Sequence, residues 1–233
     1  MKKTGIIIFI IALFIGLIFT NVFSFGKTSA RFFNFNFNFG GVKGSGNVVK
    51  ENRGVSDFTE IDVSNAIQVE IVAQKDFSVE VEADDNILPL ITTEIRGNVL
   101  RIKSEKSYNA KTPVIVRVSA PNIEDLDVSG ASKVNLTNLN NESLQIHSSG
   151  ASKINVEGTT VTLEIETSGA SKIEAENLKA ENVSVDASGA SKINVAVSND
   201  LKVDASGASN INYTGTPKNF EKKTSGASNV KQK

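Results

Sequence analysis

The chain has 233 residues, 39% of them hydrophobic and 22% charged, and its 25 basic and 26 acidic side chains give a formal net charge of −1. Lysine and arginine are spread evenly along the chain, which argues against a nucleic-acid-binding patch. The absence of cysteine excludes disulfides and a lipid-attachment cysteine, and with a single histidine it leaves no ligand set for a zinc site.

Residues 1–30 have the pattern of an export signal. Met1-Lys2-Lys3 precedes an almost unbroken apolar run, Gly5–Phe25, which predicts an N-terminal hydrophobic helix. The run is just long enough to span a bilayer, and Thr28–Ala30 offers small residues for cleavage. A cleaved signal peptide and a retained membrane anchor therefore both stay open. In either case we expect the mature chain to leave the cytoplasm.

Residues 31–53 are predicted to form a low-complexity linker. Phenylalanine and asparagine alternate over Phe32–Phe39, and several glycines follow. A second interpretation is that the aromatic face packs on the rest of the protein or on a partner, because alternating Phe and Asn is β-prone. Beside a retained anchor, the same aromatic rings would suit the membrane interface.

Residues 54–124 are predicted to be rich in strands without a regular repeat. Hydrophobic and polar residues alternate over Phe58–Ile61, Ile67–Ile71, Phe77–Val81, Val99–Ile102 and Val114–Val118. Gly97-Asn98 is expected to form a turn. Asp62–Ala66 looks like a worn copy of Asp127–Ala131, so this part is expected to be a degenerate front end of the repeat that follows.

Residues 125–233 carry the most informative feature, the tetrapeptide Ser-Gly-Ala-Ser in six copies. The copies begin at Ser129, Ser149, Ser168, Ser188, Ser206 and Ser225, in steps of 20, 19, 20, 18 and 19 residues. So regular a period predicts a repeat architecture in which each unit buries its apolar face against its neighbours.

Around each copy, apolar residues occur at odd distances from the first serine, which is the period of a strand. A unit of about 19 residues is too short for a strand, a crossover helix and a returning strand. The chain must therefore coil in parallel rungs about 4.8 Å apart. The predicted fold is all-β, a parallel β-helix or β-solenoid.

The even positions are expected to face solvent in columns. One column contains Asp127, His147, Glu166, Asp186 and Asp204, and another contains Lys133, Lys153, Lys172 and Lys192. Both are interpreted as solubilising surface, although a binding stripe is the alternative. A third column, Asn135, Asn155, Asn194 and Asn212, is expected to hydrogen-bond along the solenoid axis.

A candidate surface strip follows from the first Ser and the Ala of each copy, which should point outward. Its residues are Ser129, Ala131, Ser149, Ala151, Ser168, Ala170, Ser188, Ala190, Ser206 and Ala208. A flat strip of hydroxyls and methyls would suit contact with a second solenoid, a polysaccharide or ice. The plainer interpretation is that small residues are required by a tight bend at the glycine.

No catalytic, cofactor-binding or metal-binding residues are predicted. Ladder neighbours such as Glu166 and Asp186, or Asp186 and Asp204, could stand at the spacing of glycosidase carboxylates, but an active site should break the repeat. His147 is interpreted as a surface residue. Asp84-Asp85-Asn86 is interpreted as an acidic turn, with a loosely held cation as the alternative.

The C-terminal segment predicts a soluble monomer. The last copy of the repeat is followed by five residues, and lysines cluster around it at Lys218, Lys222, Lys223, Lys231 and Lys233. Lysine is a common guard against edge-to-edge pairing of strands.

Gly44–Asn47, Phe58–Val63, Val79–Asn86 and Leu126–Ser132 together resemble the autotransporter adhesin head domains called GIN domains. The resemblance extends from about Gly44 to the C-terminus. It implies a β-helical protein of the bacterial envelope or surface without assigned catalytic residues, and the adhesin label is itself an analogy. We therefore expect an exported, non-enzymatic adhesive or scaffolding solenoid that contacts a cell-surface carbohydrate or protein. A β-helical carbohydrate-active enzyme and a purely structural assembly module are the alternatives.

Overall fold

The computed structural model describes residues 41–233. The hydrophobic helix predicted within residues 1–30 and the Phe32–Phe39 segment lie outside the described residues. Within residues 41–233, no helix has the length and apolar character that crossing a membrane requires. The described part is almost entirely strand, with one short 3-10 helix, η1 (Leu88–Leu90).

The strands follow one another closely along the chain. The irregular front part contains β1 (Val42–Lys43), β2 (Val48–Arg53), β3 (Glu60–Val63), β4 (Gln68–Ala73), β5 (Ser78–Asp84), β6 (Ile91–Arg96), β7 (Val99–Ser104), β8 (Tyr108–Asn109) and β9 (Ile115–Ala120). The repeat contains β10 (Asp125–Gly130), β11 (Lys133–Gly150), β12 (Lys153–Gly169), β13 (Lys172–Gly189), β14 (Lys192–Ala205), β15 (Asn210–Thr214), β16 (Asn219–Thr224) and β17 (Asn229–Gln232).

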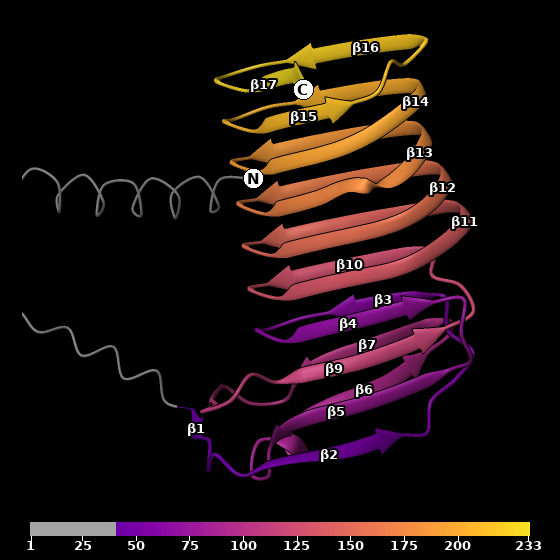
Figure 1. Ribbon diagram of the computed structural model, residues 1–233. Coiled ribbons are helices and arrows are strands. Elements are labelled where there is room, and N and C mark those ends of the chain that lie inside the picture. Colours follow the sequence, from indigo (N-terminus) through magenta and orange to yellow (C-terminus); the bar gives the residue numbers. More distant parts are fainter. Residues whose placement is uncertain (1–40) are drawn as a thin grey trace, which may run out of the picture. The chain divides into compact units, whose positions relative to one another are not determined.

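The repeat forms a parallel β-solenoid, as the sequence predicts (Figure 1). Equivalent residues stack in register, so that Ser129 pairs with Ser149, Ser149 with Ser168, and Ser168 with Ser188. Each long strand, β11 to β14, runs through two arms of the coil, and each arm pairs with the equivalent arm of its neighbours. The coils stack because no single coil can bury its own apolar face.

The two arms build two layers, here named sheet I and sheet II. Sheet I follows the order β6-β7-β3-β10, continues through the C-terminal halves of β11–β14 and ends in β16. Sheet II follows β2-β5-β9-β4, continues through the N-terminal halves of β11–β14 and ends in β15 and β17. The Ser-Gly-Ala-Ser copies form the corner that leads from sheet I to sheet II.

The core lies between the two sheets. It consists of side chains that lie at odd distances along the sequence from the first serine of each copy. Leu126, Ile146 and Ile165 of sheet I, and Val134 and Ile154 of sheet II, are fully buried. The same cluster of buried residues continues from Phe58 near the front end to Tyr213 near the C-terminus. One continuous core therefore supports the whole described chain.

The front end contains one more coil of the solenoid, as the worn copy of the repeat predicts. Asp62 and Val63 of β3 pair in parallel with Asp127 and Val128 of β10. Ile61, Val63, Ile67, Val69 and Ile71 are all buried, in agreement with their predicted inward positions. The hairpin between β6 and β7 turns at Gly97-Asn98, which confirms that predicted turn.

Directly below that coil, β7 and β9 still pair in parallel with β3 and β4. Beyond them, antiparallel pairing replaces the parallel stack, which the sequence does not predict. β2 pairs antiparallel with β5, β5 with β9, and β6 with β7. Residues 48–53, within the segment interpreted as a linker, form β2. This strand is exposed at the outer edge of sheet II, so its sequence lacks the alternation of a half-buried strand. Lys50 holds it there through ion pairs with Glu80 and Glu82 of β5, and Arg117 of β9 forms ion pairs with the same two carboxylates.

Candidate functional site

In the repeat, glycine occupies the corner of each coil. Gly130, Gly150, Gly189, Gly207 and Gly226 have positive φ angles, and Asn65, with φ 77°, holds this place in the front coil. A Cβ atom added at any of these glycines would overlap the backbone carbonyl oxygen of the residue one coil below. The same carbonyl oxygen also accepts a hydrogen bond between coils. The backbone amide of the alanine that follows each glycine donates to it at 2.7–2.8 Å.

The second serine of each copy points inward. Ser132, Ser152, Ser171, Ser191 and Ser209 are 1–2% exposed, and their hydroxyls lie 3.3–3.5 Å from the carbonyl oxygens of the coil below. Two of them also meet hydroxyls from sheet I, Ser171 with Ser148 at 2.7 Å and Ser191 with Thr167 at 3.1 Å. Serine is therefore a satisfied core residue at this position.

The candidate surface strip lies along this corner. Eight of its ten residues are exposed, while Ser129 and Ser206 are half-buried. Some of the outward hydroxyls are turned back to the backbone of the coil below: Ser129 donates to Val63 and Ser188 donates to Thr167, both at 3.4 Å. The alanine methyl groups carry no such contact and face outward.

A shallow groove of about 460 Å³ runs beside the strip on the sheet I side. Its walls include Asp127, His147, Glu166 and Asp186 from the acidic column and Ser149, Ser168 and Ser188 from the strip. His147 Nδ1 lies 3.3 Å from Glu166 and its Nε2 lies 3.6 Å from Asp125. The groove therefore offers mainly carboxylate and hydroxyl oxygens to a ligand.

The acidic column repels itself, as expected of like charges stacked on neighbouring strands. Desolvation by burial, with the charge of Asp62 next in importance, raises the pKa of Asp127 above its usual value, while His147 acts in the opposite direction. Burial likewise raises the pKa of Asp125, and the nearby Glu60 and Asp127 add to the effect. The repulsion thus extends into the front coil, where Asp62 pairs with Asp127.

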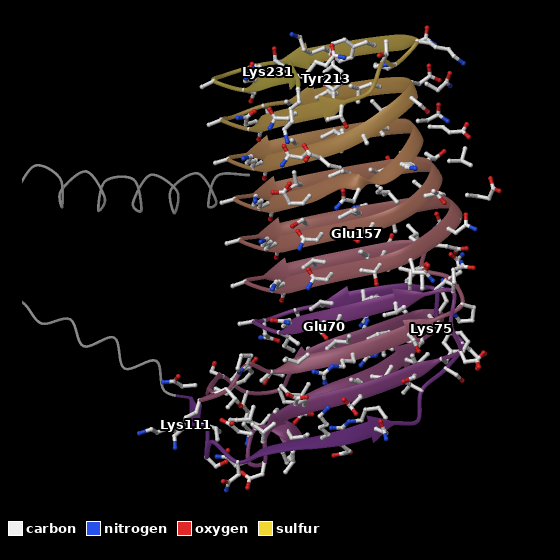
Figure 2. All side chains as sticks on the ribbon, viewed as in Figure 1. Glu70, Lys75, Lys111, Glu157, Tyr213 and Lys231 are labelled. Atoms are coloured by element: carbon white, nitrogen blue, oxygen red, sulfur yellow. The ribbon has the colours of Figure 1, made fainter. Side chains whose placement is uncertain are left out.

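The lysine and asparagine columns lie on the other face of the molecule, the outer face of sheet II. Asn155 donates to Asn135 at 2.7 Å and Asn212 donates to Asn194 at 2.8 Å, which confirms the predicted hydrogen bonding along the axis. Glu174 stands in the same column. Burial acts to raise its pKa, but hydrogen bonds from Lys172 and Asn194 outweigh burial and lower it. Figure 2 shows Glu70 and Glu157 on this face.

A larger hollow of about 1230 Å³ follows the opposite edge of the coils, where sheet II turns back into sheet I. Side chains such as Asn140, Glu142, Thr159 and Glu181 line it. No pattern in the sequence predicts this hollow. Its residues occupy turns of unequal length, with register shifts in β11, β12 and β13, so they do not recur at a fixed distance from the serines.

The Asp84-Asp85-Asn86 turn is hydrogen-bonded to residues 43–45 and to residues 111–112. Buried Asp84 accepts hydrogen bonds from the Thr112 hydroxyl at 2.6 Å and the Lys111 amide at 2.9 Å, and these donors lower its pKa. Asp85 accepts from the Ser45 hydroxyl at 2.5 Å, and Asn86 donates to the Lys43 carbonyl. The oxygens proposed above for a loose cation are thus engaged by protein donors. No cluster with metal-site geometry occurs among residues 41–233.

Comparisons with known proteins agree with this architecture. The family model described as "Putative auto-transporter adhesin, head GIN domain" matches residues 57–217. No curated protein matches the chain. A solved structure described as a "putative adhesin" from Bacteroides fragilis is 21% identical, with a TM-score of 0.66, and the match covers 82% of this chain and 100% of that one. Another from Parabacteroides merdae is 18% identical, with a TM-score of 0.53, and the match covers 82% and 98%. These structures support the fold, and the resemblance drawn from the sequence is confirmed: the chain belongs to the GIN head-domain family.

Proposed function

We propose that this chain is an exported, non-enzymatic element of the bacterial envelope or cell surface with an adhesive or scaffolding role. The family is named for adhesins, and the resemblance to adhesin structures covers most of the chain. The predicted export signal at residues 1–30 supports the location.

The proposal rests on one observation: outward-facing side chains of the same kind stack in register from coil to coil. The strip and the acidic column repeat coil after coil and border one groove of about 460 Å³. A surface of this kind presents the same contact several times along a line. It therefore suits an extended partner, such as a cell-surface carbohydrate or another protein, better than a single small molecule.

Two other functions compete. The carbohydrate-active enzyme is supported by paired carboxylates: Glu166 with Asp186, and Asp186 with Asp204, are direct ladder neighbours. Each pair, however, belongs to the ordinary repeat. The purely structural module is supported by the corner itself, because glycine there is required by the close approach of successive coils.

A carbohydrate-array screen combined with a reducing-sugar assay separates the three functions. Binding without turnover is expected for the adhesive role, turnover would establish the enzyme, and no signal in either assay would favour the structural module. The triple variant A151K/A170K/A190K places lysines on the strip and should abolish binding if the strip is the contact surface. Q145K/T162K/S184K, with the same added charge on the outer face of sheet I, is the matched control.

The location has its own test. Mass spectrometry of the mature N-terminus, combined with cell fractionation, is expected to find the protein outside the cytoplasm, either cleaved near Ala30 or retained in a membrane. An intact N-terminus in the cytoplasmic fraction would contradict export.

A further inference from the structure

The two outer faces of the solenoid carry columns of opposite charge beside the same corner. On sheet I, the acidic column comes two residues before the first serine of each copy: Asp127, Glu166, Asp186 and Asp204, with His147 in the second coil. On sheet II, the lysine column directly follows the last serine: Lys133, Lys153, Lys172 and Lys192. Apart from the half-buried His147, all of these side chains are exposed.

Within one molecule these columns do not neutralise each other. Their side chains project from opposite faces, because the two columns belong to different sheets and the Ser-Gly-Ala-Ser corner lies between them. Among the described residues, Lys172 is in contact with Glu174, whereas Lys133, Lys153 and Lys192 make no ion pair. The lysine column is thus a row of like charges on coils about 4.8 Å apart, and the acidic column is a similar row that His147 interrupts. A partner of opposite charge would relieve the repulsion within each row.

A second copy of the chain has the required shape and charge. If a copy is shifted along the normal to the sheets without rotation, its sheet II faces sheet I of the first molecule and the two corners stay on the same side. The lysine column of one molecule then lies opposite the acidic column of the other. Both have the same spacing because both follow the same coils. Three pairs then match at once, since Lys133 faces Asp127, Lys172 faces Glu166 and Lys192 faces Asp186, whereas Lys153 faces His147.

We propose that copies of this chain pack side by side in rows, with sheet I of each molecule against sheet II of the next. The contact is heterologous, because different surfaces meet, and a translation does not close on itself, so the row can extend. All molecules in such a row point the same way. That is the arrangement expected of copies attached to one membrane or displayed on one surface.

The contact is expected to be weak in dilute solution. Exposed ion pairs each contribute little to binding, and salt screens them. The proposal is therefore compatible with the monomer predicted from the C-terminal lysines for dilute protein, and rows form where copies are concentrated on a surface. The inference develops the scaffolding part of the proposed function. It is tested without any ligand, so its failure would leave carbohydrate binding untouched.

Sedimentation of the purified exported chain tests the proposal. At about 0.01 M salt, where the Debye length is ~30 Å, the mean mass should rise with protein concentration, and at about 1 M, where it is ~3 Å, it should return to that of the monomer. A mass that does not change with concentration at low salt would overturn the proposal.

Two variants test whether the lysine column and the acidic column form the contact between copies. K133Q/K153Q/K172Q/K192Q loses the lysine column, and D127N/E166Q/D186N/D204N loses most of the acidic column. Each variant alone should stay monomeric, whereas an equimolar mixture should form one-to-one pairs and nothing larger, because each keeps one intact face. K75Q/K103Q/K106Q/K179Q removes as many lysines elsewhere and should associate like the unmodified chain. Association of either column variant alone, or a mixture that stays monomeric, would contradict the proposed contact.

Cross-linking of the unmodified chain gives a test that does not depend on how the variants fold. A carbodiimide joins lysines to carboxylates that are in direct contact, and a mixture of nitrogen-14 and nitrogen-15 protein distinguishes links between molecules from links within one. The expected links join the lysine column of one copy to the acidic column of another. Intermolecular links confined to other residues would overturn the proposal.

Discussion

At the scale of single residues, the repeat is explained by contacts between consecutive coils. The glycine is required because a side chain there would overlap the backbone of the coil below. The second serine is required because its buried hydroxyl meets a carbonyl oxygen of that coil. The first serine and the alanine are not explained in this way, since both project outward. They are the residues whose identity a binding role would account for.

Gly189→Ala should therefore destabilise the protein strongly. Gly189 has φ 114°, and an added Cβ would overlap the carbonyl oxygen of Gly169. We expect a loss of at least about 2 kcal/mol in the free energy of unfolding, measured by urea denaturation. The matched control is Gly54→Ala, because nothing lies within 4 Å of a Cβ added at Gly54. Equal effects of the two substitutions would show that close stacking at the corner is unimportant.

At the scale of elements, hydrogen bonds fix the turn after β5 at the front end of the solenoid. The loop after β5 receives hydrogen bonds from residues on both sides of it in the sequence, Ser45 from the entering chain and Thr112 from the loop before β9. Gly44–Asn47 and Asp84–Asn86 are far apart in the sequence, and hydrogen bonds join them. They meet at one point of the fold.

Asp84→Asn should loosen this turn and change the acid stability of the front end. The folded-state pKa of Asp84 is lowered, chiefly by the Thr112 hydroxyl. The ionised carboxylate therefore stabilises the folded protein fully above the unfolded pKa of about 3.9, and this stabilisation is lost as the pH falls through the folded-state pKa. At neutral pH, hydrogen exchange should accelerate in residues 42–47 and 108–112 but not in β12 or β13. Asp57→Asn, at an exposed carboxylate, is the control. Unchanged exchange in the two front segments would contradict the fastening role.

At the scale of the whole molecule, the two ends of the solenoid differ. The front end is covered by antiparallel strands that ion pairs hold in place. At the C-terminal end lies the coil of β16 and β17, whose strands are mostly exposed and rich in lysine. In that coil Lys222 takes the place that Val203 holds one coil below, and Phe220 covers Tyr213 with ring centroids 5.3 Å apart. Figure 2 shows Lys231 and Tyr213 at this end.

Removing residues 216–233 should therefore promote aggregation. The truncation uncovers Leu201, Val203 and Tyr213 and deletes the lysines that discourage edge pairing. Light scattering is expected to show a mass that rises with concentration even at high salt, unlike the salt-sensitive rows proposed for the intact chain. Phe220→Ser, which keeps the lysines, is the control and should stay monomeric at high salt. A monomeric truncated chain would show that the last coil does not protect the end.

The sequence alone determined the repeat, the parallel coils and which residues enter the core, because each depends on positions at a constant spacing. It also predicted the worn front coil, since Asp62–Ala66 still follows the pattern. Only the tertiary structure decided the antiparallel front end, the hollow along the turns and the meeting of Ser45 with Asp85. It also decided that the acidic and lysine columns occupy opposite faces. These features depend on where the chain turns, and turns of variable length leave no periodic signal in the sequence.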